Sequence, residues 1–413
     1  MSTDTGHNST SSDLTWALHN PERQTDFGYR AMHGSVVFSK ALVNGYYGEA
    51  PNKSYYSGCS TGGRQGLKEA QLYSDSFDGM LIGAPAWWST GLAVWTTRIG
   101  VNNLPLTGAG HITIPQIMGL AAEVKKQCDS VDGVADGIIS APENCTFDFT
   151  KVTCGTPGVN ASTCLTEAQV VTAKNVYADY LVNDKLAFPG LLLGSENLWL
   201  VMMTGSAPIP LGQDYVRYFL LGDPSWNWTR FNDSIMTLAA DQDPGHLTAD
   251  HFDGLSEFQS RGGRILMYHG DADALIPTRS SDYFYNRTAE AMRPESGEIR
   301  DWFRYFRVPG MGHCAGSAVD APWYFAGANQ AGGLGTDRFS VAGFEDNEHD
   351  ALLALVDWVE KGRPVDAIIA TAWRNGSVPE SGVLRQRALC PVPKRAVLES
   401  GGDEKSAKSW RCT

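Results

Sequence analysis

The stretch Gly58-Cys59-Ser60-Thr61-Gly62 matches the pattern G-x-S-x-G. It stands between residues 54–57, which read as a short strand, and residues 62–73, in which apolar side chains recur at helical spacing. At such a strand-to-helix turn, glycines allow a strained backbone that exposes the serine hydroxyl, and the helix N-terminus offers N–H groups to an oxyanion. The context therefore favours Ser60 as a nucleophile over the alternative, a glycine-rich turn with an incidental serine.

Strand-like segments after this motif predict a parallel sheet. Residues 77–82 read as a buried strand, and sheet-like sequence resumes at residues 265–269 and 302–308, each followed by a glycine-containing turn. Helical periodicity marks residues 26–46 and 350–361. Alternating strands and helices are typical of an α/β fold, in which helices cover both faces of a parallel sheet.

The region between these groups of strands has a different character. Residues 86–260 hold four of the eight cysteines, many tryptophans and several glycine- and proline-rich clusters. A chain of 413 residues also exceeds the size at which one core usually stays undivided. We therefore predict three segments: residues 1–85 with the nucleophile, residues 86–260 as an inserted lid, and residues 261–413 as the second part of the sheet domain.

A nucleophilic serine needs a base and an acid, and in sheets of this type they follow it in the order acid, then histidine. His313 lies in a glycine-rich loop just after a predicted strand, whereas His269 lies within or at the end of one. His313 is therefore the better candidate for the base. Two aspartates directly follow the strand at 265–269; we prefer Asp273 as the acid, with Asp271 as its rival.

Two cysteines flank the proposed catalytic pair, because Cys59 precedes Ser60 and Cys314 follows His313. A disulfide requires Cα atoms roughly 4.4–6.8 Å apart, so a bridge between them would bring Ser60 and His313 within reach of each other. The alternative is two unrelated buried thiols. None of the eight cysteines forms a C-x-x-C pair, which makes disulfides a better interpretation than zinc.

A second cluster of polar residues lies in the predicted lid, where aspartates and glycines alternate over residues 128–138. Carboxylates at such short intervals, with backbone carbonyls, suit calcium. The spacing is not that of an EF-hand, and a solvated turn is the alternative. Because the loop lies far from Ser60 in the sequence, we assign any metal there a structural role.

Charge and acceptor patterns restrict the class of partner and the compartment. The formal net charge of −13 argues against a nucleic acid or an anionic membrane as partner. An even number of cysteines and several N-x-[ST] acceptors predict a secreted glycoprotein. These acceptors are Asn8, Asn52, Asn144, Asn160, Asn227, Asn232, Asn286 and Asn375. Yet the first residues have neither the basic nor the apolar region of a signal peptide, so either the true N-terminus is missing or the protein is not secreted.

Three motifs resemble the tannase and feruloyl esterase family of secreted serine esterases. They are Gly58-Cys59-Ser60-Thr61-Gly62-Gly63-Arg64-Gln65-Gly66, Tyr268-His269-Gly270-Asp271-Ala272-Asp273 and Gly312-His313-Cys314. The resemblance covers essentially the whole chain. It implies an α/β-hydrolase fold with an inserted lid, a disulfide between the neighbours of the catalytic serine and histidine, and Asp273 rather than Asp271 as the acid.

The same resemblance implies a set of ligands and bridges. A structural calcium ion in the lid would be held by the side chains of Asp129, Asp132 and Asp136 and by the carbonyls of Val134 and Ile138. The remaining disulfides would be Cys128 to Cys145, Cys154 to Cys164, and Cys390 to Cys412.

In one respect the chain departs from the family pattern. Family members carry a longer segment before Thr3-Asp4-Thr5-Gly6-His7, which includes a signal peptide, early strands and a loop that donates one oxyanion N–H. We therefore expect a shortened chain that lacks several N-terminal strands and has an exposed sheet edge. We also expect half an oxyanion hole, and losing one such donor typically costs about 10²–10³ in turnover.

The function that follows is a serine carboxylic ester hydrolase for phenolic esters, either feruloyl and cinnamoyl or galloyl, free or attached to plant cell-wall polysaccharide. We expect Ser60 to form an acyl-enzyme, His313 to act as base, Asp273 to orient it and the Thr61 N–H to bind the oxyanion. Tryptophans of the lid are expected to select the acyl group, with a preference for the feruloyl side: Trp87, Trp88, Trp226 and Trp228. The alternative is a catalytically impaired or non-catalytic, calcium-binding member of the family.

Overall fold

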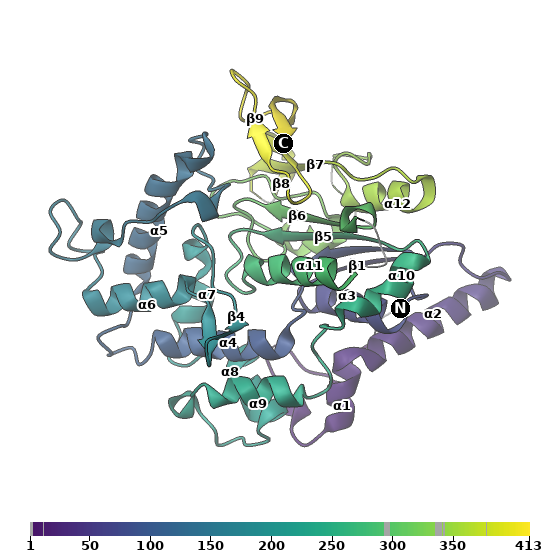
Figure 1. The fold of residues 1–413 in the computed structure, drawn as a ribbon, viewed down its shortest axis with the longest axis horizontal. Coiled ribbons are helices and arrows are strands. Elements are labelled where there is room, and N and C mark those ends of the chain that lie inside the picture. The colour runs from purple at the N-terminus through teal and green to yellow at the C-terminus, as the bar shows by residue number, and fades with distance from the viewer. Residues whose placement is uncertain (1–2, 11, 293–297, 335–340, 342, 377) are drawn as a thin grey trace.

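The computed structural model of the chain describes residues 3–10, 12–292, 298–334, 341, 343–376 and 378–413. A parallel sheet lies at the centre, a helical lobe lies to its left and below it, and C-terminal strands rise above it (Figure 1). The lobe is formed by the residues between the second and third strands of the sheet.

The sheet has four strands in the order β1-β2-β5-β6, and all three neighbouring pairs are parallel. Its strands are β1 (Tyr55–Cys59), β2 (Gly79–Gly83), β5 (Arg264–Gly270) and β6 (Phe303–Val308). These are the four segments that the sequence predicts, displaced by one or two residues. The α/β fold is therefore confirmed, and among the described strands β1 forms one edge of the sheet.

Helices cover both faces of this sheet, because its strands bury alternate side chains on opposite faces. On one face, Leu81 and Leu266 pack with side chains of α12 (Ala351–Lys361). On the other face, Met80 and Met267 pack with α3 and α11. The helices beside the sheet are α3 (Thr61–Leu72), α10 (Ser256–Ser260) and α11 (Thr278–Met292), preceded in the chain by α1 (Pro21–Thr25) and α2 (Ala31–Tyr47).

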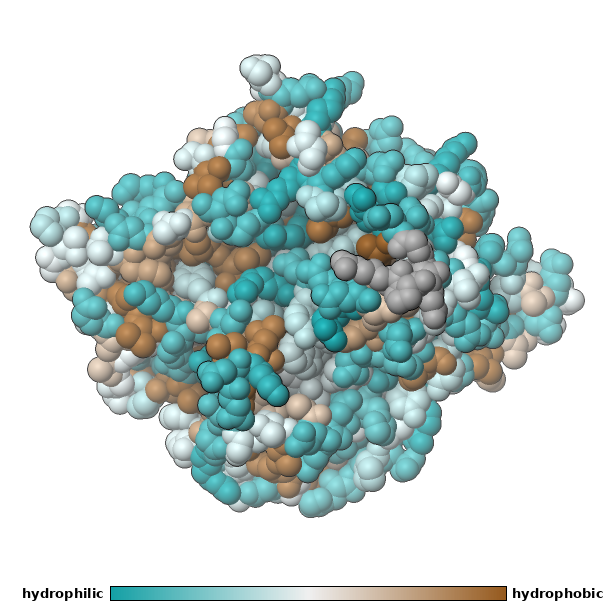
Figure 2. Space-filling model, in the orientation of Figure 1, coloured by the Kyte–Doolittle hydropathy of each residue, from teal (hydrophilic) through white to brown (hydrophobic). Residues whose placement is uncertain are grey.

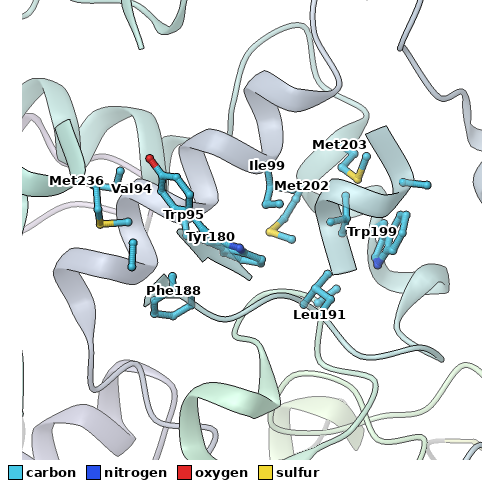
Figure 3. Close-up of a cluster of buried hydrophobic side chains, with 14 of the residues drawn as sticks. Val94, Trp95, Ile99, Tyr180, Phe188, Leu191, Trp199, Met202, Met203 and Met236 are labelled. Atoms are coloured by element: carbon cyan, nitrogen blue, oxygen red, sulfur yellow. The ribbon is translucent and has the colours of Figure 1, made fainter. Parts of the chain in front are cut away.

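The lobe has its own apolar core, drawn in Figure 3, in which Trp95 and Trp199 are fully buried. Its helices are α4 (Ser89–Asn102), α5 (Ile114–Cys128), α6 (Glu167–Tyr177), α7 (Leu200–Met203), α8 (Pro210–Asp214) and α9 (Ser234–Gln242), with a hairpin of β3 (Tyr180–Val182) and β4 (Lys185–Phe188). Capping boxes start α5 and α6, where Thr113 and Thr166 pair with glutamines three residues later. This lobe falls within the segment that we predict as the lid, residues 86–260, whose last helix, α10, lies beside the sheet instead; the division into domains stays a prediction.

The C-terminal part of the chain adds two antiparallel hairpins that the sequence analysis did not predict. They are formed by β7 (Ile368–Asn375) with β8 (Val378–Leu389), and by β9 (Ala396–Leu398) with β10 (Trp410–Cys412). All eight cysteines form the four expected bridges: Cys59–Cys314, Cys128–Cys145, Cys154–Cys164 and Cys390–Cys412.

The surface is mixed in character. On the face drawn in Figure 2, hydrophobic side chains gather mainly over the lid helices at the left of the view. Helix α2 also exposes apolar side chains, among them Phe38 at 60% and Tyr46 at 79% of their area. Within the described parts of the chain, no helix has the length and apolar character that crossing a membrane requires.

Candidate active site

Ser60 occupies a strained turn between β1 and α3. Its φ of 62° and ψ of −120° place a non-glycine residue in a region that is rarely populated, as at the nucleophile of a strand-to-helix elbow. The Ser60 N–H donates to the Gly83 carbonyl at 3.0 Å, and the Ser60 carbonyl accepts from Arg64 and Ala86, each at 3.0 Å. The turn is therefore held on both sides by backbone hydrogen bonds.

Glycines close to Ser60 allow this tight geometry. A Cβ on Gly63 would lie 2.6 Å from the Gly83 carbonyl oxygen, and one on Gly58 would lie 2.8 Å from the Gly62 backbone. Larger residues would push α3 away from β1 and β2. Because Thr61 is the first residue of α3 and directly follows Ser60, its N–H has no partner within the helix.

Asp273 and His313, which come from loops after β5 and β6, meet at one hydrogen bond. Asp273 Oδ2 lies 2.7 Å from His313 Nδ1, and Asp273 Oδ1 accepts from the N–H groups of Leu275 and Ile276, each at 2.9 Å. Burial opposes the charge on Asp273, but the His313 charge and the hydrogen bonds of the two histidines outweigh it and hold the pKa of this carboxyl well below its usual range. Burial likewise lowers the pKa of His313, but nearby Asp273 outweighs it, so the net shift is upward.

His269 also contacts Asp273, and sequence analysis considered it only as a rival base. The side chain is fully buried. Its Nε2 lies 3.1 Å from Asp273 Oδ2 and 2.9 Å from the Ile276 carbonyl oxygen, two acceptors that require a proton on Nε2. Its Nδ1 then accepts from the Ser281 hydroxyl at 2.8 Å. His269 is thus fixed as a donor that orients the Asp273 carboxylate. Its place near the end of β5, four residues before Asp273, is the pattern that could have indicated this role.

Asp271, the rival acid, faces another partner. Its Oδ1 accepts from Arg307 Nε at 2.8 Å. Burial raises the pKa of Asp271, and the Arg307 charge opposes that shift. Of the two aspartates, only Asp273 is in contact with His313.

The Cys59–Cys314 bridge ties the loop of Ser60 to the loop of His313. The two Cα atoms are 6.0 Å apart, within the range that such a bond requires. Ser60 and His313 line the same cavity. Because Nδ1 of His313 is bonded to Asp273, its Nε2 is left for the cavity side. The structure therefore brings the three predicted catalytic side chains to one place.

The cavity beside Ser60 and His313 has a volume of about 150 Å³. Most of its lining is apolar and comes from the N-terminal segment, the lid and the loop after β5. The lining includes Leu14, Phe27, Leu92, Ile209, Leu211, Phe219, Leu247, Leu275 and Ile276, together with Arg64 and Tyr215. Sequence analysis assigned none of these residues to a substrate cavity, although Arg64 belongs to the motif at residues 58–66.

The tryptophans expected to select the acyl group lie elsewhere, so that expectation is wrong. None of the four belongs to the described lining of this cavity. Trp226 is buried in the lid core, and Trp87 packs beside the sheet and donates to the Ser280 carbonyl. Trp88 stacks on Tyr283. Large aromatic side chains bury more area than any others, and Trp87 and Trp226 are buried in cores here.

Arg64 joins the parts of the chain that form the cavity. Its guanidinium donates to the carbonyls of Phe27, Gly28 and Leu247, so it links α3 to the N-terminal segment and to the lid. Burial lowers its pKa to about 10. Arg64 therefore stays a cation near neutral pH and holds the walls of the cavity together.

The predicted calcium loop carries oxygen ligands of the right kind, and each carboxylate also bonds within the protein. Asp129, Asp132 and Asp136 each accept from a backbone N–H of the loop, and Asp136 also pairs with Arg387. Val134 and Ile138 lie buried on the same loop, which Cys128–Cys145 closes. Among the described side chains, no three carboxylates, histidines or cysteines gather closely enough to hold an ion. The donor chemistry fits calcium, but a bound ion would have to draw these carboxylates together, so the site stays a prediction.

Comparisons with known proteins give one consistent answer. A sequence model described as "Tannase and feruloyl esterase" matches residues 1–191 and 246–413. A probable feruloyl esterase B-2 from Aspergillus terreus is 37% identical over 412 residues, which cover 98% of this chain and 74% of that protein. The crystal structure of an esterase from Aspergillus oryzae superposes with a TM-score of 0.90 at 34% identity, over 99% of this chain and 78% of that one. The crystal structure of feruloyl esterase B from Aspergillus oryzae gives a TM-score of 0.87 at 32% identity, over 96% of this chain and 77% of that one.

Proposed function

Since the chain belongs to the tannase and feruloyl esterase family of carboxylic ester hydrolases, we propose that it cleaves hydroxycinnamoyl esters through an acyl-enzyme on Ser60. One observation supports this most strongly. Asp273 is bonded to His313, and His313 shares a cavity with Ser60, while a disulfide links the neighbours of Ser60 and His313. An alcohol, an imidazole and a carboxylate arranged in this way are the groups that acyl transfer requires.

Catalysis then proceeds in two half-reactions. His313 Nε2 takes the proton of Ser60 as Oγ attacks the ester carbonyl, and the Thr61 N–H binds the oxyanion that forms. The tetrahedral intermediate collapses, the carbon–oxygen bond to the alcohol breaks, and His313 returns the proton to the departing alcohol. Water enters next, gives a proton to His313 and attacks the acyl carbon, which releases the acid and restores Ser60.

The cavity favours hydroxycinnamoyl over galloyl groups. An apolar cavity of about 150 Å³ is large enough for one benzene ring. A galloyl ring brings three hydroxyl groups, each of which needs a hydrogen-bond partner when it is buried. The mainly apolar lining offers few such partners, so a feruloyl or coumaroyl ring fits it better. The alcohol portion of the ester need not enter this cavity, and we therefore propose both small esters and esters on cell-wall sugars as substrates.

The test is hydrolysis of methyl ferulate and methyl gallate by the wild-type protein and by Ser60→Ala. We expect the wild-type protein to prefer methyl ferulate and the variant to lose activity by several orders of magnitude, since its nucleophile is gone. A variant as active as the wild type would rule out Ser60 as nucleophile. A preference for methyl gallate would instead contradict only the assignment of the acyl group.

We further propose a structural calcium ion at residues 129–138, supported by three carboxylates and two sharp glycine turns. Gly133 and Gly137 adopt φ values of 91° and 85°, which turn the chain so that its carbonyls and carboxylates lie on a short loop. No catalytic step depends on this ion. Its role would be to stiffen the loop that the Cys128–Cys145 bridge closes.

Secretion and glycosylation are the last part of the proposal. Four disulfides favour an oxidising compartment, and all eight acceptor asparagines are exposed. In the acceptor at Asn375, the hydroxyl residue Ser377 lies outside the described residues. Expression in a fungal host, followed by enzymatic removal of N-glycans, should lower the mass of the secreted protein; an unchanged mass would contradict glycosylation.

A further inference from the structure

Tyr215 lines the active-site cavity, and its buried hydroxyl has no hydrogen-bond partner among the described residues. Its side chain is 3% exposed and belongs to the cavity lining. Its Oη makes no hydrogen bond with any residue that the structure describes. Buried hydroxyl groups are usually hydrogen-bonded in folded proteins, and an unpaired one on a residue that lines a substrate cavity can take its partner from the substrate.

Two other polar side chains of this wall, Arg64 and Ser89, are already engaged within the protein. Arg64 donates to three backbone carbonyls, and the Ser89 hydroxyl donates to the Ala86 carbonyl. Ser60 and His313 belong to the reacting end of the cavity. Thr61 and Thr96 also belong to the described lining, and among the hydroxyl groups of this lining that of Tyr215 is the one that is buried without a partner.

The backbone around Tyr215 holds its ring in place. It begins the π-helical segment Tyr215–Leu220, and a second π-helical segment, Asp26–Arg30, brings Phe27 to the same cavity. Single π-helical turns occur frequently at functional sites, because the extra residue redirects side chains. Tyr215 stacks on Phe219 with ring centroids 5.6 Å apart. Because this packing already restricts the Tyr215 side chain, substrate binding costs it little further conformational entropy.

The hydroxyl also stays protonated. Burial raises the pKa of Tyr215 far above its usual range, and the nearby charge of Asp243 raises it further. A neutral phenol can donate one hydrogen bond and accept others, and Tyr215 keeps this form near neutral pH.

We propose that the Tyr215 hydroxyl donates a hydrogen bond to a hydroxyl on the aromatic ring of the acyl group, so that the enzyme selects ring-hydroxylated cinnamoyl esters over unsubstituted ones. This inference rests on the proposed function and narrows its substrate class. A site that is built to bond a substrate hydroxyl discriminates strongly against the analogue without it, because the protein group then stays unpaired.

The first measurement uses the wild-type protein alone. We expect kcat/KM for methyl 4-hydroxycinnamate or methyl 3-hydroxycinnamate to exceed that for methyl cinnamate by about 10-fold or more. Which of the two hydroxylated esters is preferred identifies the ring position that Tyr215 contacts. If methyl cinnamate is hydrolysed as efficiently as both, the proposal is overturned without any variant.

The second measurement compares Tyr215→Phe with Tyr218→Phe. Tyr218 lies on the same π-helical segment, packs partly buried against the lid core and is outside the cavity lining, which makes it a matched control. We expect Tyr215→Phe to bring the ratio of hydroxylated to unsubstituted ester close to one, and Tyr218→Phe to keep the wild-type ratio. A Tyr215→Phe protein with the wild-type ratio would contradict the proposal. Failure of the proposed function has a different signature, namely activity that survives Ser60→Ala.

Discussion

Asp273 Oδ2 lies 2.7 Å from His313 Nδ1, whereas Asp271, two residues earlier in the same turn, bonds Arg307 instead. We therefore expect Asp273→Asn to lower kcat on the order of 10⁴-fold, because an amide can neither fix the imidazole tautomer nor stabilise an imidazolium. Steady-state kinetics on methyl ferulate measure this effect.

Asp271→Asn serves as the matched control. It weakens a buried charge pair and should lower the free energy of unfolding by about 1–3 kcal/mol. When kcat is measured at a temperature well below the melting temperature, the variant should stay within about 10-fold of wild type. If Asp271→Asn proved the more damaging variant for kcat, the assignment of the acid would have to be reversed.

The pH profile should report His313. Asp273 raises the pKa of His313 above its ordinary value, and the imidazole must be neutral to accept the Ser60 proton. Activity should therefore fall as the pH drops through the folded pKa, and kcat/KM should show an acidic limb centred above about 6.5. In Asp273→Asn the negative charge is gone, so the limb should move to lower pH. A limb that stays in place would contradict the coupling.

The same coupling makes stability depend on pH. Because the pKa of His313 is higher in the folded than in the unfolded state, protonated His313 stabilises the fold. This contribution is fully present below the unfolded pKa of about 6.5 and is lost as pH rises through the folded pKa. Chemical denaturation of wild type and of His313→Gln at pH values from about 5 to about 9 should show that the difference between their free energies of unfolding shrinks as the pH rises.

His269 should act on catalysis only through Asp273. We expect His269→Ala to lower kcat by about 10- to 100-fold, a loss usual for outer hydrogen-bond partners, with little change in KM. His269→Gln keeps an N–H donor and should recover part of the loss. His251→Ala, at an exposed histidine beside Asp253, is the control and should behave as wild type. Equal losses for His269→Ala and His269→Gln would indicate a packing role instead.

The sequence was most informative where chemistry and local backbone coincide. The turn at Ser60 needs glycines and a strand-to-helix change, and both are local patterns; the same holds for the loops that carry Asp273 and His313. The cavity is different, because Leu14, Phe27 and Tyr215 come from distant segments with no shared pattern. Their meeting depends on tertiary contacts such as those of Arg64, and these cannot be read from periodicity.

The Cys59–Cys314 bridge should matter for activity as well as for stability. The bond joins residues 255 positions apart, and removing a native bridge typically costs about 2–5 kcal/mol. Removing this bridge also frees the loops of Ser60 and His313. The Cys59→Ala/Cys314→Ala protein should therefore have a lower kcat than wild type even when it is assayed well below its melting temperature. Removing Cys154–Cys164, which closes only ten residues in the lid, should lower the melting temperature less and leave kcat near wild type. Equal kcat for both variants would show that the first bridge only stabilises the fold.

Calcium should stabilise the folded protein if the loop at residues 129–138 binds it, because an ion that binds only the native state adds RT ln(1 + [L]/Kd) to its stability. At 100 times Kd this is about 2.7 kcal/mol, so chelation with EGTA should lower the melting temperature by several degrees, and added Ca²⁺ should restore it. Mg²⁺ should restore the melting temperature poorly, since this ion requires smaller, stricter octahedral sites.

Asp129→Asn should abolish the response to chelation, whereas Asp184→Asn, in the exposed turn between β3 and β4, should not. If the wild-type melting temperature is the same with EGTA and with Ca²⁺, the carboxylates serve only their own backbone N–H groups and Arg387, and the loop is held by hydrogen bonds rather than by a metal.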